Sequence, residues 1–368
     1  MTDQNLSRRG RRGRRPRPKW VLIGIGAVAF LAVGAVAANA ATIGKGVAVE
    51  QSSLSETITV ADSGMLQMSS GTDTDMVDPA VAAPANAPSV QYRTASAPAD
   101  RTFTELLGLN DVNRAVGFFG SGADAKHPTH GLVLTLERRT IDFTTVNVPG
   151  SVQTEVTGVD NAGDLVGWFV AKNGANLGFI KRRGVFTTIA APGGKGAKHP
   201  VTRLLGIDNK GFAVGFFNDA KGVPHAFEIQ INTRRFINLV LPVKTDGVVA
   251  TSVDDRGDIG GFFIVGKSTF GFFVRKRLLT ILNLGGKATT KVLGVNNDAT
   301  LVGSFVDAAG RTHGFVFMWR DRKVRQIDVP GSVGLTVVSD INNRAQIDGF
   351  FRDKAGHIVG FIARLIRS

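Results

Sequence analysis

The pattern of apolar and polar residues repeats along most of the chain from Leu107 onward. In each copy an aliphatic residue and an Asn/Asp pair precede, by about six residues, a glycine followed by one or two aromatic residues. The six copies of this turn begin at Gly108, Gly158, Gly206, Ser252, Gly294 and Asp340. Successive copies begin 50, 48, 46, 42 and 46 residues apart. A period in the forties indicates stacked or radially arranged units.

Each unit predicts four short strands. In the second copy these are Glu155–Val159, Leu165–Val170, Leu177–Ile180 and Phe186–Ile189, separated by turns of Asn, Asp, Arg and Gly. Asx and Gly residues supply the positive φ that hairpin turns require, so their recurrence needs no catalytic explanation. Four strands in a repeat of this length are typical of a propeller blade.

The two ends of the repeat array complement each other. The sixth copy stops after its third strand, at Val359–Ala363, five residues before the end of the chain. Upstream of the first copy, Tyr92–Pro98 aligns with the fourth-strand motif Phe186–Pro192. This segment is therefore expected to complete the last blade, which leaves no sheet edge bare. The sequence predicts an all-β, six-bladed β-propeller over residues 89–368, with an open β-solenoid as the alternative.

Residues 1–41 carry an export signal. A tract of eight basic residues between Arg8 and Lys19 precedes an uncharged run from Val21 to Ala41, which we expect to form one hydrophobic helix. The end of the run, Ala38–Ala40, fits a cleavage site, yet the 18 residues from Val21 to Ala38 are almost long enough to span a bilayer. We expect either a cleaved signal peptide or, if residues 21–41 stay uncleaved, a membrane anchor. Both place the propeller outside the cytoplasm, on the cell surface or secreted.

Residues 42–88 differ in composition from the repeat region. They are rich in Ser, Thr, Ala, Asp and Pro and show no sustained periodicity, so a flexible low-complexity linker is expected. The alternative is that a short helix or strand forms around Val47–Leu66.

A histidine tripeptide connects the repeats to a known family. His225–Phe227 reads His-Ala-Phe, and the variants His130–Leu132 and His313–Phe315 occupy the same position in two other copies. With the Asx turns, these residues resemble the bacterial extracellular HAF repeat over about Tyr92–Phe361. The resemblance implies a propeller-like fold and an extracellular location. It implies no common activity for the family.

The sequence excludes cysteine-dependent chemistry and lacks the common catalytic motifs. The chain has no cysteine and therefore no thiolate metal site or cysteine nucleophile, and it lacks Gly-x-Ser-x-Gly, His-Glu-x-x-His and P-loop motifs. We interpret the repeated histidines as packing residues, because copies two, four and six carry Leu177, Phe270 and Val359 in their place. The acidic turns at Asp160 and Asp254 lack calcium-loop spacing. No metal or cofactor is expected.

Positive charge is the one recurring feature that turn formation does not require. Residues 101–368 contain 34 basic and 22 acidic side chains, a net charge of +12. The basic residues recur after the third strand of each unit, where a propeller would place them on one face. The candidate anion-binding residues are Arg138, Arg139, Lys181, Arg182, Arg183, Arg234, Arg235, Arg275, Lys276, Arg277, Arg320, Arg322 and Lys323. The alternative interpretation is that these are solvated turns which protect strand edges.

The sequence favours a non-enzymatic binding module. The expected partner is an anionic cell-wall polymer, a lipid head group or an acidic protein, and no nucleic acid is expected. The alternative is a propeller hydrolase or lyase with its site in the central channel, for which Asp348 and Glu228 are residues that depart from the repeat. A purely structural role in protein association is the third hypothesis, and the oligomeric state is left open.

Overall fold

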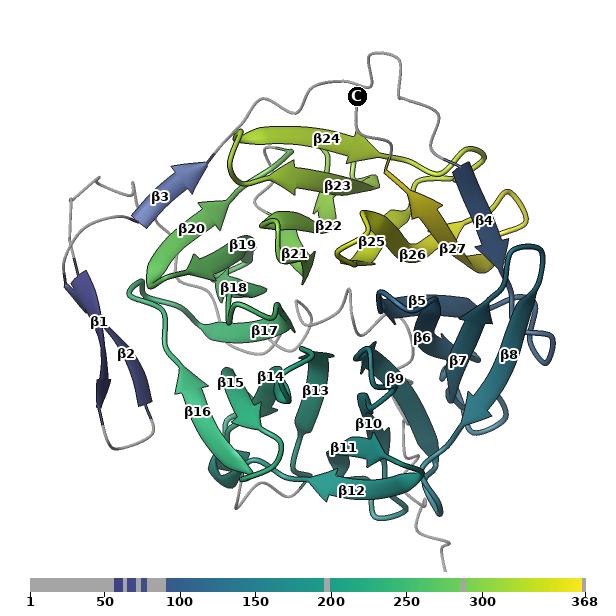
Figure 1. Cartoon of the computed structure of the whole chain (residues 1–368), viewed down its shortest axis with the longest axis horizontal. Helices are drawn as coiled ribbons and strands as arrows, with labels where there is room; N and C mark the ends of the chain where they lie inside the picture. Colours follow the sequence, from purple (N-terminus) through teal and green to yellow (C-terminus); the bar gives the residue numbers. More distant parts are fainter. Residues whose placement is uncertain are drawn as a thin grey trace, which may run out of the picture.

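The computed structural model describes residues 56–61, 65–70, 74–77, 91–194, 199–285 and 289–365. Its strands form six sheets arranged around a central axis, as Figure 1 shows. The predicted all-β, six-bladed propeller is therefore confirmed, with four antiparallel strands in each blade.

The four strands of each blade run from the axis outward. The innermost strands are β5 (Thr104–Leu109), β9 (Gln153–Val159), β13 (Thr202–Ile207), β17 (Gly247–Val253), β21 (Thr290–Val295) and β25 (Thr336–Ile341). The second strands are β6 (Arg114–Phe119), β10 (Leu165–Val170), β14 (Phe212–Asn218), β18 (Ile259–Val265), β22 (Thr300–Val306) and β26 (Gln346–Arg352). The third strands are β7 (His130–Leu136), β11 (Asn176–Arg182), β15 (Pro224–Gln230), β19 (Ser268–Arg275), β23 (Thr312–Met318) and β27 (Ile358–Arg364). The outermost strands are β8 (Ile141–Val146), β12 (Val185–Ile189), β16 (Arg235–Leu239), β20 (Leu278–Leu282), β24 (Lys323–Ile327) and β4 (Gln91–Ala95).

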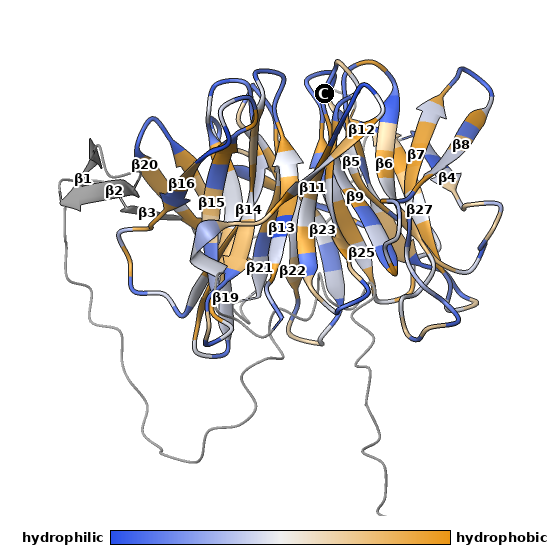
Figure 2. Cartoon of the chain, turned by 90° about the horizontal axis from the view of Figure 1, so that it is seen from below, coloured by the Kyte–Doolittle hydropathy of each residue, from blue (hydrophilic) through white to orange (hydrophobic). Residues whose placement is uncertain are grey.

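The hydrophobic core lies between neighbouring blades. One buried cluster combines Ala95 and Ile362 of the sixth blade with Leu106 and Leu132 of the first. Figure 2 shows the same distribution, with apolar residues along the strands and hydrophilic residues in the loops at the two faces. Because each blade is covered by the next, the strands read as dense apolar runs rather than as alternating ones.

The repeated glycine of the second strand is required by a close backbone approach. A β-bulge displaces each inner strand, for example between Leu204 and Gly206. A Cβ atom on Gly215 would lie 1.9 Å from the carbonyl oxygen of Arg203. In each of the other five blades, the equivalent glycine lies about as close to the equivalent carbonyl oxygen of its own inner strand. The repeated glycines of the second strands therefore serve strand packing.

The two ends of the repeat array meet in the sixth blade. β4 pairs antiparallel with β27, and Ala95 lies opposite Gly360. The sixth sheet has the order β25-β26-β27-β4 and so contains four strands although its last repeat supplies three.

Three further strands occur within residues 42–88, where the sequence predicts a linker with a short helix or strand as the alternative. β1 (Glu56–Ala61) pairs with β2 (Met65–Ser70), and β2 and β3 (Thr74–Val77) run parallel to β16 and β20. The outer edges of the third and fourth blades thus gain backbone partners (Figure 1).

The expected hydrophobic helix lies outside the described residues. Within the described ranges, no helix is both long and apolar enough to cross a membrane.

Candidate functional site

Two sets of turns share one face of the propeller. Inner and third strands of a blade run in the same direction, because each is antiparallel to the second strand between them. The turns that follow inner strands and those that follow third strands therefore lie at the same end of the blade. We call this end the turn face. A contact between Arg182, after a third strand, and Asp164, after an inner turn, joins the two sets directly.

The structure brings the candidate basic residues to the outer part of the turn face. All thirteen lie at the turns between third and fourth strands of blades one to five. Lys181 and Arg275 are half-buried, and the other eleven are exposed. In the sixth blade the corresponding position, at the end of β27, holds the exposed Arg364. The predicted placement on one face is thus consistent with the strand directions.

Several of these basic residues adopt a backbone conformation that favours glycine or asparagine. Arg183, Arg234 and Arg322 have φ values of 49°, 55° and 54°. In the turn between β19 and β20, Arg275 pairs with Leu278, and both central residues, Lys276 and Arg277, have positive φ, 47° and 72°. This is a two-residue hairpin of the type that Asn-Gly forms at lower cost. The chain therefore carries charge here against the preference of the backbone.

The inner turns are capped by their own Asx side chains. The Oδ1 atom of Asp208 accepts hydrogen bonds from the backbone N–H groups of Lys210 and Phe212, at 2.9 and 2.7 Å. Asp254 caps Arg256 and Asp258 in the same way. These bonds explain the acidic turns without calcium. Burial nevertheless raises the pKa values of Asp208 and Asp254.

The second Asx residue of each inner turn forms a closed belt of hydrogen bonds around the axis. In every blade its backbone N–H donates to the Oδ1 atom of the next blade's Asx residue, at 2.8 to 3.0 Å. In order, the belt residues are Asp111, Asn161, Asn209, Asp255, Asn297 and Asn343. The two aspartates also accept side-chain N–H bonds from both neighbouring asparagines. The belt joins all six blades at the turn face.

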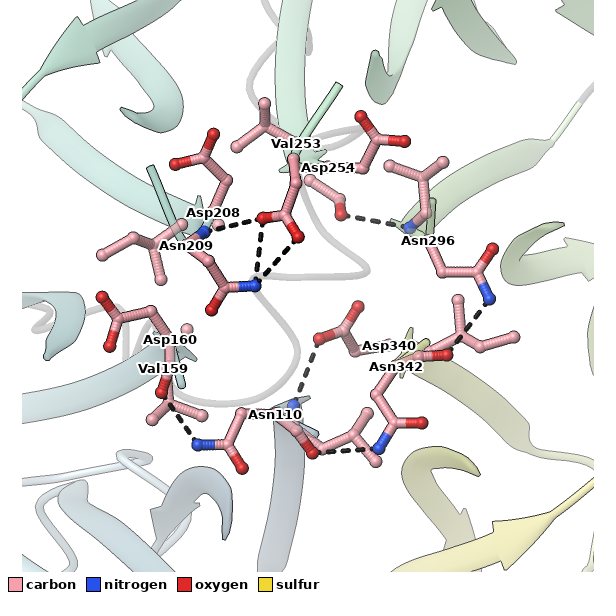
Figure 3. A pocket seen from close by; sticks show the side chains of 18 of the residues that line it. Asn110, Val159, Asp160, Asp208, Asn209, Val253, Asp254, Asn296, Asp340 and Asn342 are labelled. Carbon is pink, nitrogen blue, oxygen red and sulfur yellow. Dashed lines mark hydrogen bonds between the residues drawn. The ribbon is translucent and has the colours of Figure 1, made fainter. Parts of the chain in front are cut away.

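A small polar cavity lies on the axis inside the belt (Figure 3). Its volume of about 70 Å³ accommodates only a few atoms. Among the described residues that line it are six aspartates and no lysine or arginine. Leu107, Leu205 and Leu293 also line it, and Leu107 and Leu293 belong to one buried cluster that joins blades five, six and one. The axis is thus acidic at the turn face and apolar beneath.

Two aspartates of the sixth blade break the repeat at this cavity. Asp340 stands where four other copies have glycine, and its side chain points inward (Figure 3) and accepts the backbone N–H of Leu109 at 3.1 Å. Asp348 lies opposite Asp340 in the strand register and is 0% exposed. Neither of its oxygens makes a hydrogen bond within 3.5 Å, although the nearby backbone N–H groups of Asp340 and Gly108 act to lower its pKa. Burial raises the pKa of Asp340 to about 7 and raises that of Asp348 well above its ordinary value, with the neighbouring Asp340 adding to the rise. Of the two departures named from sequence, Asp348 lies in β26 beside Asp340, which lines the axial cavity, whereas Glu228 lies in β15.

Sequence reasoning missed a buried charged layer near the start of the inner strands. Glu105, Glu155, Arg203 and Lys291 occupy one register position and are at most 9% exposed. Burial raises the pKa of Glu155 to about 8 and lowers that of Lys291 to about 8. The guanidinium of Arg203 lies 3.7 Å from the ring centre of Trp168. The sequence does contain a signal for this layer. The other two copies carry valine, Val249 and Val337, at the same position, so a charged residue there departs from an apolar one.

The repeated histidines are packing residues. His225 stacks on Phe217 and contacts Asp219 at 3.1 Å, and His313 lies beside Phe305 and hydrogen-bonds Asp328. Each therefore serves its own blade, as the packing interpretation predicted. No group of three or more His, Asp or Glu residues in the described ranges is arranged to hold a metal ion.

Comparison with known proteins finds solved structures that are similar to this one, but no family. The sequence matches no family model and no curated protein. Among solved structures it is similar to TolB from Acinetobacter baumannii, with a TM-score of 0.47 and 11% identity over 68% of this chain and 63% of that one. It thus spans less than two thirds of TolB. A mutant of AofleA from Arthrobotrys oligospora has a TM-score of 0.41 and 10% identity over 78% and 88% of the two chains. A nidogen/laminin complex has a TM-score of 0.42 and 13% identity over 65% and 86%. Similarity at these levels assigns the chain to no family.

Proposed function

We propose that this protein is an extracytoplasmic binding module of the HAF-repeat type, which holds an anionic cell-envelope partner on its turn face. The partner is an anionic cell-wall polymer, a lipid head group or an acidic protein. The N-terminal basic and apolar segments provide export and, if residues 21–41 are retained, attachment to the membrane.

The observation that carries this proposal is the retention of basic residues at positive φ. Lys276 and Arg277 occupy both central positions of a tight hairpin, where Asn-Gly would be less strained. Solvation of a turn does not require a cation at such a position, because asparagine or glycine is equally well solvated. Charge kept against backbone preference in several blades favours a role for the charge itself.

The geometry of the turn face supports a multivalent contact. Single exposed ion pairs contribute little, about 0–1 kcal/mol each. Basic turns from five blades on one face can contact successive charges of a polymer, so weak contacts add within one complex. Such binding is strongly weakened by salt.

The test compares the two faces of the full chain. Binding to anionic liposomes and to cell-wall material is measured by co-sedimentation across a salt series. The turn-face variant combines Arg183→Glu with Arg277→Glu, and the matched control combines Lys221→Glu with Lys354→Glu in turns of the opposite face. We expect salt-sensitive binding that the turn-face variant loses and the control keeps. Equal binding by both variants, or no binding at low salt, would contradict the proposal.

A hydrolase or lyase with a site on the axis is the second candidate. The specific observation that favours it is the pair Asp340 and Asp348, two carboxyl groups with raised pKa values, of which Asp340 lines the axial cavity. The cavity volume of about 70 Å³ restricts such a site to a substrate group of a few atoms. Turnover of a polysaccharide that Asp340→Asn abolishes, with the fold unchanged, would support this candidate.

A further inference from the structure

One aromatic side chain separates two of the basic turns. The indole of Trp319, at the end of β23, lies between blades four and five. The guanidinium carbon of Arg275 lies 5.3 Å from its ring centre, and that of Arg322 lies 5.2 Å from it. The indole N–H donates to Thr280 at 3.1 Å, and Phe273 contacts the ring edge-on. The ring is therefore fixed by blade four while it holds guanidinium groups from both blades.

The equivalent position in blade two shows what is special about this junction. Arg182 and Arg275 both end a third strand and precede a two-residue turn. Arg182 donates to Asp164 at 2.5 Å and to Asn232 at 2.7 Å. Arg275 is 3.5 Å from Asp258, its side chain is 13% exposed, and its buried Nη1 atom makes no hydrogen bond in the described chain. The arginine at the indole thus has a buried donor without an acceptor, whereas its counterpart in blade two donates to two acceptors.

The charge around the indole is not balanced. The two turns contribute Arg275, Lys276, Arg277, Arg320, Arg322 and Lys323. The acidic groups beside them are fewer, namely Asp254, Asp258, Asp298 and Asp321. Burial and the neighbouring Asp254 raise the pKa of Asp258 to about 6, so its countercharge weakens in mild acid. Two guanidinium groups on one indole ring, with more basic than acidic groups around them, favour a counter-anion beside the ring.

We infer that Arg275, Trp319 and Arg322 form an oxyanion clamp for a phosphate or sulfate group of a polyanionic partner, with Trp319 as the positioning residue. The inference rests on the proposed function and names its principal anchor. Guanidinium forks match the oxygen atoms of such groups. Guanidinium groups already contact the indole, so the clamp recognises the charged group rather than a sugar ring.

The test measures binding of fluorescently labelled polyphosphate to the full chain by anisotropy. We expect Arg275→Gln and Arg322→Gln each to weaken binding about tenfold, the loss of one charge-assisted contact. Arg182→Gln, at the corresponding turn of blade two, is the comparison within the binding face and should weaken binding less than about threefold. The matched control, Lys221→Gln in a turn of the opposite face, should leave affinity unchanged. Trp319→Leu weakens binding although it removes no charge, and Trp319→Phe restores most of it because a phenyl ring also attracts guanidinium. Thermal unfolding curves verify that each variant is folded.

The outcomes separate this inference from the proposed function. Equal losses for Arg182→Gln and Arg275→Gln would overturn the clamp and leave a diffuse binding ring. An unchanged affinity in both Trp319 variants would also overturn it. Failure of the wild-type chain to bind polyphosphate, dextran sulfate or polyglutamate at low salt would overturn the proposed function itself. Dextran sulfate binding more tightly than polyphosphate supports the clamp and identifies sulfate as the group, whereas tighter polyglutamate binding contradicts it.

Discussion

Asp348 shows how a single residue departs from the repeat at a structural cost. Four of the five other copies carry valine at its position, and the fifth carries Gly260. The carboxyl group is fully buried and has no hydrogen-bond partner for either oxygen at the 3.5 Å limit. Burial of a polar group without such a partner is unfavourable. The sequence reveals the substitution, but not the burial or the neighbouring Asp340, because both depend on how strands pair.

Restoring the repeat residue should stabilise the protein. We expect Asp348→Val to raise the free energy of unfolding by about 1–3 kcal/mol at pH 8, because it removes an unfavourable buried carboxyl group. Chemical denaturation measures the change. The reverse substitution in blade five, Val302→Asp, should lower the free energy of unfolding. A destabilised Asp348→Val variant would show that the carboxyl group has a stabilising partner.

The same pair predicts a pH dependence of stability. The pKa of Asp340 is raised to about 7 and that of Asp348 is raised as well, so the folded chain holds protons that the unfolded chain releases near pH 4. The stabilising contribution of the pair is complete below about pH 4 and is lost as pH rises toward 7. Denaturation midpoints between pH 4 and 8 should therefore fall more steeply for the wild-type chain than for Asp348→Val. Parallel curves would contradict the pKa shifts.

At the scale of single elements, turn chemistry was readable from sequence and blade contacts were not. The strands predicted for the second copy match β9, β10, β11 and β12 to within two residues, because Asx and Gly fix the turns between them. The belt residues were identified only as turn formers. Their second role, as acceptors for the next blade, arises because turns 42 to 50 residues apart meet around the axis.

The belt predicts a stability cost at Asp255. This side chain accepts the backbone N–H of Asn209 and side-chain N–H groups of Asn209 and Asn297. We expect Asp255→Ala to lower the free energy of unfolding by about 1.5–3 kcal/mol, since several donors lose their acceptor. Asp255→Asn, which keeps one oxygen, should cost less. Chemical denaturation would count against the belt if both variants were as stable as the wild type.

The hairpin between β19 and β20 should reveal a trade between stability and binding. The double substitution Lys276→Asn and Arg277→Gly gives this hairpin the residues that its turn type prefers. We expect it to raise the free energy of unfolding by about 1 kcal/mol. The same change removes two positive charges, so affinity for polyanions should fall. Denaturation and anisotropy on one preparation measure both effects. Unchanged polyanion affinity would show that the charges of this turn do not contribute to binding.

At the scale of the whole molecule, repeat period and turn pattern sufficed to predict the six-bladed architecture. The basic turns were likewise predicted to share a face, because strand direction follows from strand count. The axial cavity and the buried layer of Glu105, Glu155, Arg203 and Lys291 were not predicted, since each requires side chains from several blades. The hydrophobic segment, the export route and membership of the HAF repeat family stay predictions.

The pairing of β4 with β27 predicts that the first strand is needed for a stable ring. A chain that begins at residue 96 leaves the β27 edge unpaired, from Gly360 to Arg364. We expect its melting temperature to fall by about 5–10 °C and its tendency to aggregate to rise. A chain that begins at residue 89 keeps β4 and is the matched control. Equal melting temperatures for the two chains would show that closure does not depend on β4.

Hydrogen–deuterium exchange of the full chain with and without polyphosphate shows whether the turn face is the binding surface. We expect slower exchange in the turns between third and fourth strands, most of all in residues 275–278 and 319–323. Turns of the opposite face, such as residues 219–223 and 353–357, should exchange as before. Protection confined to the opposite face, or no protection where binding occurs, would contradict the account.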